Sequence, residues 1–330
     1  NTKIHDICTD EFYHKDAHAI GVQNGIGFVI QNNTIWNTGA ALEFWSGNYD
    51  MKNNTIRYNY IKDVYNKKIT SGGGIVISGN TDPEKRHSYY IYGNIIQNPA
   101  LGTNEDFQGG GITVNIGGDA DLHIYNNIVY EEGGSHDNGR GAIRVYNSQG
   151  YPLQNVHIYN NIIYEPNYRY LFLQGDGDPW INVSVDNNLY YPVNSSSGHL
   201  FHFGRSIEHD TDSVFADPIF VSGSPTKADD FMLQNTSPAI DAGFDVGISH
   251  DRINQPIPQD GNNDTWSIPD IGAYEFSKGE LINFQCAHEA DRYPCDGVLS
   301  FMEIQNYTLL WHDGDVPLQS LLEVVNLWNG

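Results

Sequence analysis

Apolar and polar positions alternate along short segments of the chain, and this alternation recurs about seven times. Each segment opens with a small residue or glycine and then carries two apolar side chains two positions apart. The pairs are Ile20/Val22, Leu42/Phe44, Ile75/Ile77, Ile112/Val114, Ile143/Val145 and Leu171/Leu173, with a weaker seventh near Leu200. Because successive side chains of a strand point to opposite faces, each pair predicts a short β-strand with one buried face.

A second pattern, apolar-x-x-Asn-x-apolar, follows each of these six pairs. Its copies contain Asn33, Asn59, Asn94, Asn127, Asn161 and Asn188, at steps of 26 to 35 residues. Two strands per repeat with loops of variable length are typical of a solenoid, in which successive coils stack as parallel strands. Asn tolerates left-handed turn conformations and can hydrogen-bond along a stack, so we interpret these residues as turn supports and not as ligands.

This repeat resembles the right-handed parallel β-helix of the pectate lyase-like superfamily. After the coils, Asp217–Phe220 (DPIF), Ser237–Gly243 (SPAIDAG) and Asp270–Phe276 (DIGAYEF) resemble the C-terminal module of many secreted β-helix proteins that act on or bind polysaccharides. The predicted fold is therefore all-β, with a right-handed parallel β-helix over residues 1–205 and a C-terminal β cap over residues 206–277. The resemblance implies fold and context more than reaction. We interpret Asp241 and Asp270 as turn or capping residues.

The last segment, residues 278–330, has apolar residues at helical spacing and predicts a small helical module. Its Asp296-Gly297 and Glu303 match the second half of an EF-hand calcium loop, with Glu at the twelfth position. The first half departs from that pattern, because Arg292 and Pro294 fall at ligand positions and Asp291 comes one residue early.

The segment therefore resembles a dockerin-like module with an altered loop. Ca²⁺ held by Asp291, Asp296 and Glu303 is one alternative. A metal-free loop closed by a disulfide between Cys286 and Cys295 is the other. The apolar helix faces are interpreted as the core of this module, and a partner for the tail is the alternative.

Composition limits the classes of partner. The chain has 17 Lys and Arg against 41 Asp and Glu, a net charge of −24, which disfavours nucleic acid and anionic membranes. No apolar run is long enough for a membrane span. The first residue is Asn1 and not Met, as in a processed secreted protein. Sequons at Asn32, Asn182, Asn235 and Asn306 permit N-glycans. We expect a secreted or cell-surface protein.

The candidate ligand surface is the outward face of the first strand type. If Ile75 and Ile77 point inward, one outward row contains Glu43, Val76, Thr113, Arg144, Phe172 and His202, and the next contains Gln23, Trp45, Ser78, Asn115, Tyr146 and Gln174. In the rows, aromatic rings can stack on sugars and polar groups can bond their hydroxyls. The candidate substrate-binding residues are Glu43, Trp45, Asn115, Phe172 and Gln174. The alternative is that loops cover the rings as a local core. We expect these outward side chains to contribute little to stability.

The candidate catalytic residues come from one stretch that is rich in ionisable side chains: His136, Arg140, Arg144 and Tyr146. In polysaccharide lyases of the resembled superfamily, an Arg or Lys takes the proton beside a uronate carboxylate, while calcium or another cation neutralises that carboxylate. Arg144 with Arg140 fits those roles, and Asp176 and Asp178 are candidate Ca²⁺ ligands.

A glycoside hydrolase would instead need two facing carboxylates about 5–9 Å apart. Glu43, Asp137, Asp176 and Asp178 are available, but no spacing singles out a pair. The sequence thus favours a carbohydrate-active protein, a polysaccharide lyase ahead of a glycoside hydrolase. The alternative is a non-catalytic, glycan-binding surface or filament protein. The repeat begins at the very start of the sequence, so the first coil needs cover from further residues or from end-to-end self-association.

Overall fold

The computed structural model describes residues 2–7, 18–47, 49–64, 73–78, 85–99, 110–115, 119–130, 141–147, 152–164, 169–175, 180–191, 201–203, 211–262 and 264–277. The chain divides into two compact units. One comprises residues 1–252 and 256–276, and the other comprises residues 253–255 and 277–330. Every strand named below belongs to the first unit. The predicted helical tail, with Asp291, Asp296 and Glu303, lies outside the described residues.

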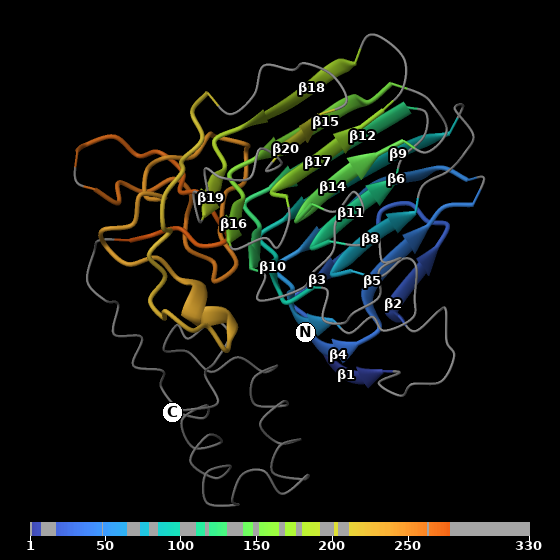
Figure 1. Cartoon of the computed structure of the whole chain (residues 1–330), viewed down its shortest axis with the longest axis horizontal. Coiled ribbons are helices and arrows are strands. Elements are labelled where there is room, and N and C mark those ends of the chain that lie inside the picture. The colour runs from blue at the N-terminus through green and yellow to red at the C-terminus, as the bar shows by residue number, and fades with distance from the viewer. Residues whose placement is uncertain are drawn as a thin grey trace, which may run out of the picture. The chain divides into compact units, whose positions relative to one another are not determined.

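Three parallel sheets form the first unit, and their strands follow one another in a fixed rotation along the chain (Figure 1). Sheet A contains β1 (Lys3–Ile7), β4 (Thr34–Thr38), β7 (Tyr60–Val64), β10 (Ile95–Gln97), β13 (Ile128–Tyr130), β16 (Ile162–Tyr164) and β19 (Leu189–Tyr191). Sheet B contains β2 (His18–Gln23), β5 (Ala40–Trp45), β8 (Ile75–Ser78), β11 (Ile112–Asn115), β14 (Ile143–Tyr146), β17 (Leu171–Gln174) and β20 (Phe201–Phe203). Sheet C contains β3 (Val29–Gln31), β6 (Met51–Arg57), β9 (Arg86–Tyr92), β12 (Asp119–Tyr125), β15 (Gln154–Tyr159) and β18 (Ile181–Asp186).

The fold is a parallel β-helix, as the repeat predicts. Each coil runs from sheet B to sheet C to sheet A, and each strand pairs with its equivalent one coil away. The predicted inward pairs form the core, with Leu42, Ile75, Val114 and Ile143 fully buried. The coils therefore bury one apolar row per strand, the arrangement in which a solenoid gains its stability.

The coils contain three strands where the sequence pattern predicts two. The stretch around each ladder Asn is not one strand, because the residue before that Asn turns the chain from sheet C into sheet A. This residue is left-handed, with φ of 56° at Asn32, 58° at Tyr58 and 63° at Gly93. The left-handed position is thus the neighbour of the ladder Asn, and glycine or Asn tolerates it best.

The buried Asn residues form the predicted ladder. The side-chain oxygen of Asn127 accepts hydrogen bonds from the backbone N–H of Asn94 at 3.1 Å and from its side-chain amide at 3.0 Å. Asn127 in turn donates to the backbone oxygen of Ile91 at 2.9 Å and to Asn161 at 3.0 Å. The same bonds recur at the other steps, and Ser213 continues the ladder by accepting from the Asn188 N–H at 2.9 Å. Each ladder Asn therefore satisfies backbone groups that the turn buries.

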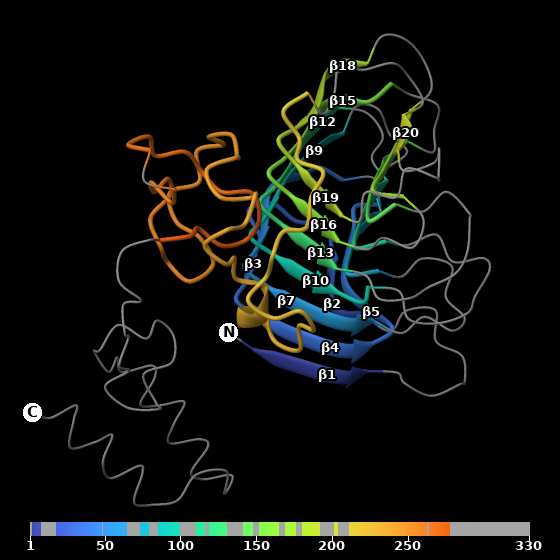
Figure 2. The ribbon, with the colours of Figure 1, turned by 60° about the vertical axis from the view of Figure 1, so that its left-hand side comes forward.

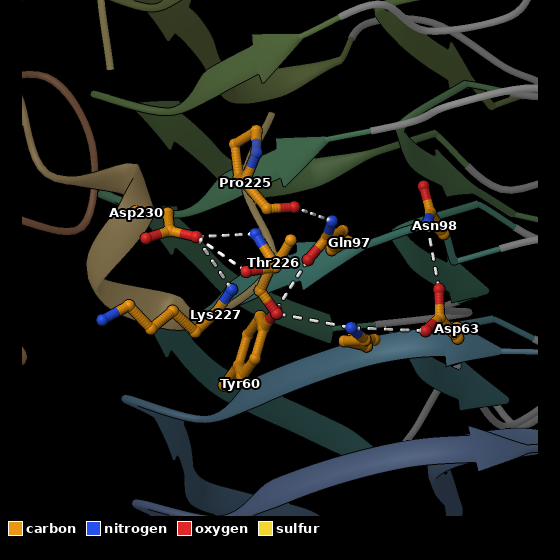
Figure 3. Close-up of polar contacts among 9 residues, drawn as sticks. Tyr60, Asp63, Gln97, Asn98, Pro225, Thr226, Lys227 and Asp230 are labelled. Carbon is orange, nitrogen blue, oxygen red and sulfur yellow. Dashed lines mark hydrogen bonds and ion pairs between the residues drawn. The ribbon is translucent and has the colours of Figure 1, made fainter. Parts of the chain in front are cut away.

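The chain that follows the coils covers the outer face of sheet A, and it contains the 3₁₀ helix η1 (Ala228–Phe231) (Figure 2). Figure 3 shows how its Pro225 and Thr226 lie against β7 and β10. The Tyr60 hydroxyl donates to Gln97 at 2.6 Å and lies 3.1 Å from the backbone oxygen of Thr226, and the Gln97 amide donates to the backbone oxygen of Pro225 at 2.8 Å. Sheet A therefore offers no open face at these strands.

Residues 241–252 and 256–276 attach to the turns between sheets C and A. The Asn126 side chain donates to the backbone oxygens of Asp270 at 3.1 Å and Gly272 at 3.0 Å. Asn160 exchanges hydrogen bonds with the backbone of Phe244 at 2.7 and 2.8 Å. Asn126 and Asn160 are left-handed residues that each precede a ladder Asn. In these two Asn-Asn doublets the first member therefore bonds to the C-terminal segment and the second to the ladder.

Asp241 and Asp270 make the turn contacts that the sequence interpretation expects, with Asp241 itself left-handed at φ of 52°. Asp270 accepts backbone hydrogen bonds from Asp241 at 2.8 Å and Phe276 at 2.5 Å. Burial, together with the neighbouring Glu275, raises the pKa of Asp270 to about 8. Between residues 211 and 277 the structure has isolated bridges, such as Phe220 with Leu233, in place of strands.

Candidate functional site: the outer face of sheet B

The strand registers align the two outward rows that the alternation predicts on sheet B. Row one joins Glu43, Val76, Thr113, Arg144, Phe172 and His202 across β5, β8, β11, β14, β17 and β20. Row two joins Gln23, Trp45, Ser78, Asn115, Tyr146 and Gln174. The five candidate substrate-binding residues and two of the candidate catalytic residues therefore share one face.

Row one is more deeply buried than predicted. Thr113 and Arg144 are each 6% exposed, Phe172 is 5% exposed and Val76 is 4% exposed. This burial is contrary to the premise that outward side chains support no core, and the burial of Phe172 agrees with the local-core alternative. Row two is more open, because Trp45 is 54% exposed, Gln174 is exposed, and Asn115 and Tyr146 are half-buried.

Arg144 lies between two rings of its own face. Its guanidinium carbon is 3.9 Å from the centroid of Tyr146 and 5.3 Å from that of Phe172. Burial lowers the pKa of Arg144, and the Tyr146 phenol opposes that shift. Arg169, which the sequence reasoning missed, places a second guanidinium 5.6 Å from the Phe172 centroid. The result is a cationic, aromatic cluster in which the charge lies beneath the half-exposed Tyr146 ring.

A second cluster occupies the other end of the same rows. The Nε2 atom of His18 contacts Oε2 of Glu43, and the Ser78 hydroxyl donates to Oε1 of Glu43 at 3.4 Å. Trp45, whose indole is exposed, belongs to row two and lies next to Glu43 of row one. Alternation from Ile20 would point His18 inward, so the pattern gave no reason to select it. Its imidazole instead lies beside Gly21, with Nδ1 3.7 Å from the position that a Cβ would take there.

The two clusters are too far apart to form one reaction centre. Glu43 and Arg144 are separated by three strand spacings, which is about 14 Å. Glu43 is also the sole carboxylate in the two rows as the structure describes them. That part of the face therefore lacks the carboxylate pair that a glycoside hydrolase requires.

The remaining predicted site residues lie outside the described ranges. They are His136 and Arg140 among the candidate catalytic residues, and Asp176 and Asp178 among the candidate Ca²⁺ ligands. Within the described residues, no group of three or more His, Cys, Asp or Glu side chains can hold a metal ion. The described face therefore supplies no calcium site, and its charge chemistry rests on Arg144, Arg169, Glu43 and His18.

Sheet C carries an ordered outer surface that the sequence reasoning missed. Tyr90, His123 and His157 follow one another on adjacent coils, with ring centroids 4.7 and 5.2 Å apart and interplanar angles of 2° and 22°. The neighbouring row places Tyr125 and Tyr159 at 5.9 Å, and Phe244 stacks on Tyr159 at 5.5 Å. The signal was present, because the residues on either side of the buried Ile in the Asn pattern are aromatic or His in three consecutive repeats.

Tyr90, His123 and His157 stack face to face, so the stacked faces are closed to a ligand and the ring edges remain. The edges are also paired, because His123 contacts the Tyr125 hydroxyl at 2.5 Å and Asp121 at 2.8 Å. The indole of Trp45 on sheet B has Gln23 and Ser78 as row neighbours instead of rings. Sheet B is therefore the better candidate for stacking on a sugar.

Comparisons of the chain with models of protein families, with curated proteins and with solved structures found no match. The class of protein is therefore defined by the fold alone: a parallel β-helix. Among the described residues, no helix is long and apolar enough to cross a membrane.

Proposed function

We propose that this chain is an extracellular carbohydrate-active protein that holds a polysaccharide along the outer face of sheet B. The observation that carries the proposal is the cluster of Arg144, Tyr146 and Phe172 in line with the exposed Trp45. Rings that stack on sugar faces, next to groups that bond hydroxyls or carboxylates, are a common chemistry of sugar recognition. Parallel strands align these groups along the direction in which an extended chain would lie.

The reaction that fits the cluster best is β-elimination at a uronate residue. In its deprotonated form, which burial favours by lowering the pKa of Arg144, this side chain accepts the proton on the carbon beside the carboxylate and becomes a guanidinium cation. The bond from the neighbouring carbon to the glycosidic oxygen breaks, a carbon–carbon double bond forms, and the leaving oxygen takes up a proton. Arg169 supplies positive charge near the same ring as Arg144, where negative charge develops on the substrate carboxylate.

One observation favours a non-catalytic, glycan-binding protein as the second candidate. Arg144 is 6% exposed and lies under Tyr146, so a substrate that lies on row two would not contact its guanidinium unless the Tyr146 ring moves. In that case the face would bind a glycan, and the β-helix would act as a rigid spacer. Filaments formed end to end would favour this candidate.

A panel of polysaccharides, assayed in two ways, separates the candidates. Unsaturated products that absorb in the ultraviolet would show a lyase, whereas new reducing ends without such absorbance would show a hydrolase. Binding without either product would show the non-catalytic protein. If no polysaccharide binds, the proposed function is wrong.

A further inference from the structure

The described outer face of sheet B is electrically polarised along the solenoid axis. Glu43 places a carboxylate at the β5 end, whereas Arg144 and Arg169 place guanidinium groups at the β14 and β17 end. The described row positions between them, Val76, Ser78, Thr113 and Asn115, are uncharged. One face therefore presents two different charge environments to a chain that follows the rows.

The environment at Arg144 suits a carboxylate. Two guanidinium groups lie within 5.6 Å of the Phe172 ring centroid, and the surroundings are buried, so their charge is weakly screened. Elsewhere the chain repels anions, because its net charge is −24. A uronate residue would therefore bind preferentially over this end of the face.

The environment at Glu43 suits an uncharged sugar. Its carboxylate is half-buried and accepts from Ser78, so it can accept sugar hydroxyls beside the open indole of Trp45. A uronate at the same place would bring two carboxylates together in partly desolvated surroundings, which is unfavourable. His18 compensates this charge only when its imidazole is protonated.

We propose that the ligand of sheet B is a mixed polysaccharide, in which uronate residues are separated by uncharged sugars, and not a polymer with a carboxylate on every residue. The inference rests on the proposed function. The relevant separation is the distance of about 14 Å between the Glu43 and Arg144 positions, set by three strand spacings. Over that distance a homopolymer of uronates places a carboxylate near Glu43, whereas a mixed polymer can place a neutral sugar there.

The test compares the affinity of the whole protein for hyaluronate and xanthan, which are mixed acidic polymers, with its affinity for polygalacturonate and polyguluronate. We expect at least one mixed polymer to bind at least tenfold more tightly than both homopolymers at neutral pH. Equal or tighter binding of a homopolymer would overturn the inference and leave the proposed function standing. Binding of none of the four would overturn the inference, and the proposed function would then depend on the wider panel of polysaccharides.

Two matched variants locate the effect. Glu43→Gln should raise affinity for polygalacturonate severalfold while leaving the fold unchanged by circular dichroism. Asp121→Asn removes the same charge from a similar carboxylate–imidazole pair on sheet C, where Asp121 lies 2.8 Å from His123. It should leave the preference unchanged. A Glu43→Gln protein that still rejects polygalacturonate as strongly as wild type would contradict the role given to this carboxylate.

Discussion

The outer faces of sheets B and C are built on the same coils but follow different rules. On sheet C, successive coils repeat the same kind of side chain, so that Tyr90, His123 and His157 stack in one row. On sheet B, successive coils change the side chain from Glu43 to Val76 to Thr113 to Arg144. On sheet C, each stacked ring contacts a ring on the next coil. On sheet B, neighbouring side chains differ in kind, so they are less well matched to one another.

The comparison teaches how to separate structural from functional positions in a solenoid. Identical neighbours at the strand spacing form a ladder that stabilises the coil, as the buried Asn residues also do. A row of unlike side chains lacks the stability that such a ladder provides. We therefore expect that some other requirement, such as function, keeps these side chains in place. Arg57 on sheet C also breaks repetition, but its guanidinium bonds to the adjacent coils, donating to Gln31 at 2.7 Å and to the Tyr92 hydroxyl at 2.8 Å. We therefore expect Arg57 to support the coil and Arg144 on sheet B to serve the proposed function.

The largest expected difference is between two arginines that lie over tyrosine rings, Arg144 on sheet B and Arg57 on sheet C. Arg144→Met keeps an unbranched apolar stem between Tyr146 and Phe172 but removes the proton acceptor, so turnover of a cleaved polysaccharide should fall at least about 10²-fold. Arg57→Met is the matched control on sheet C, where the guanidinium lies 5.8 Å from the Tyr92 centroid. It should leave turnover unchanged.

Initial rates and melting temperatures of both variants decide this prediction. A similar loss of turnover in both would mean that the arginines act through stability and that the faces do not differ. Full activity of Arg144→Met would place the chemistry elsewhere on the chain.

The next effect compares two asparagines. Asn127→Ala should lower the free energy of unfolding by about 1–3 kcal/mol, because the Asn94 N–H and the Ile91 carbonyl lose their buried partner. Ligand affinity should not change. Asn115→Ala on sheet B should instead weaken glycan binding and have the smaller effect on stability, because Asn115 is only half-buried. Urea unfolding and glycan binding of the two variants would show whether the roles are reversed.

The sequence predicted the parts of this structure that repeat. Spacing alone placed Leu42, Ile75 and the other inward residues in the core, and it placed Asn127 and its equivalents in a ladder. It missed the third strand of each coil, because an apolar-x-x-Asn-x-apolar stretch has the same pattern whether or not its middle residue turns left-handed. The turn at Asn126, with φ of 50°, is a backbone property that periodicity does not encode.

The candidate site was predictable in register but not in environment. Alternation aligned Arg144 with Phe172, but it carried no information on what covers them, so their burial was unexpected. The pairing of His18 with Glu43 depends on a side-chain direction at the start of β2 that departs from alternation. The ring rows of sheet C were within reach of the sequence, because the flanking positions of the ladder repeat in the same way as the ladder itself.

A third, smaller effect compares two exposed aromatic residues. Tyr90→Ala removes a ring that stacks on His123 at 4.7 Å, so stability should fall by about 0.5–1.5 kcal/mol with glycan binding intact. Trp45→Ala removes a ring that is 54% exposed on sheet B, so glycan affinity should fall and stability should change little. The comparison breaks down if Trp45→Ala destabilises the protein more than Tyr90→Ala does.

The smallest effect is the part of the pH dependence that the ring row of sheet C contributes. Burial lowers the pKa of His157, its neighbour His123 lowers it further, and Asp121 opposes the shift. The neutral ring suits its contacts, because Nε2 lies 3.3 Å from the Asn182 amide, which donates, and Nδ1 lies 2.8 Å from the Ser184 hydroxyl. A proton on Nε2 would therefore cost the bond from Asn182.

The sign of this dependence follows from the lowered pKa. Below about pH 6.5 the unfolded chain protonates its His157 first, so the folded state loses stability as the pH falls, until folded His157 is protonated as well. The loss should stay below about 1 kcal/mol, because the ring is partly open to solvent.

Buried His87, whose pKa is also lowered, acts in the same direction. The measurement is therefore the difference in acid loss of stability between the wild type and a His157 variant. Urea unfolding at pH 7.5 and 5 should show a shallower acid loss for His157→Gln than for wild type. An unchanged slope for His157→Gln would mean that the ring row tolerates charge, and sheet C would then be as adaptable as sheet B.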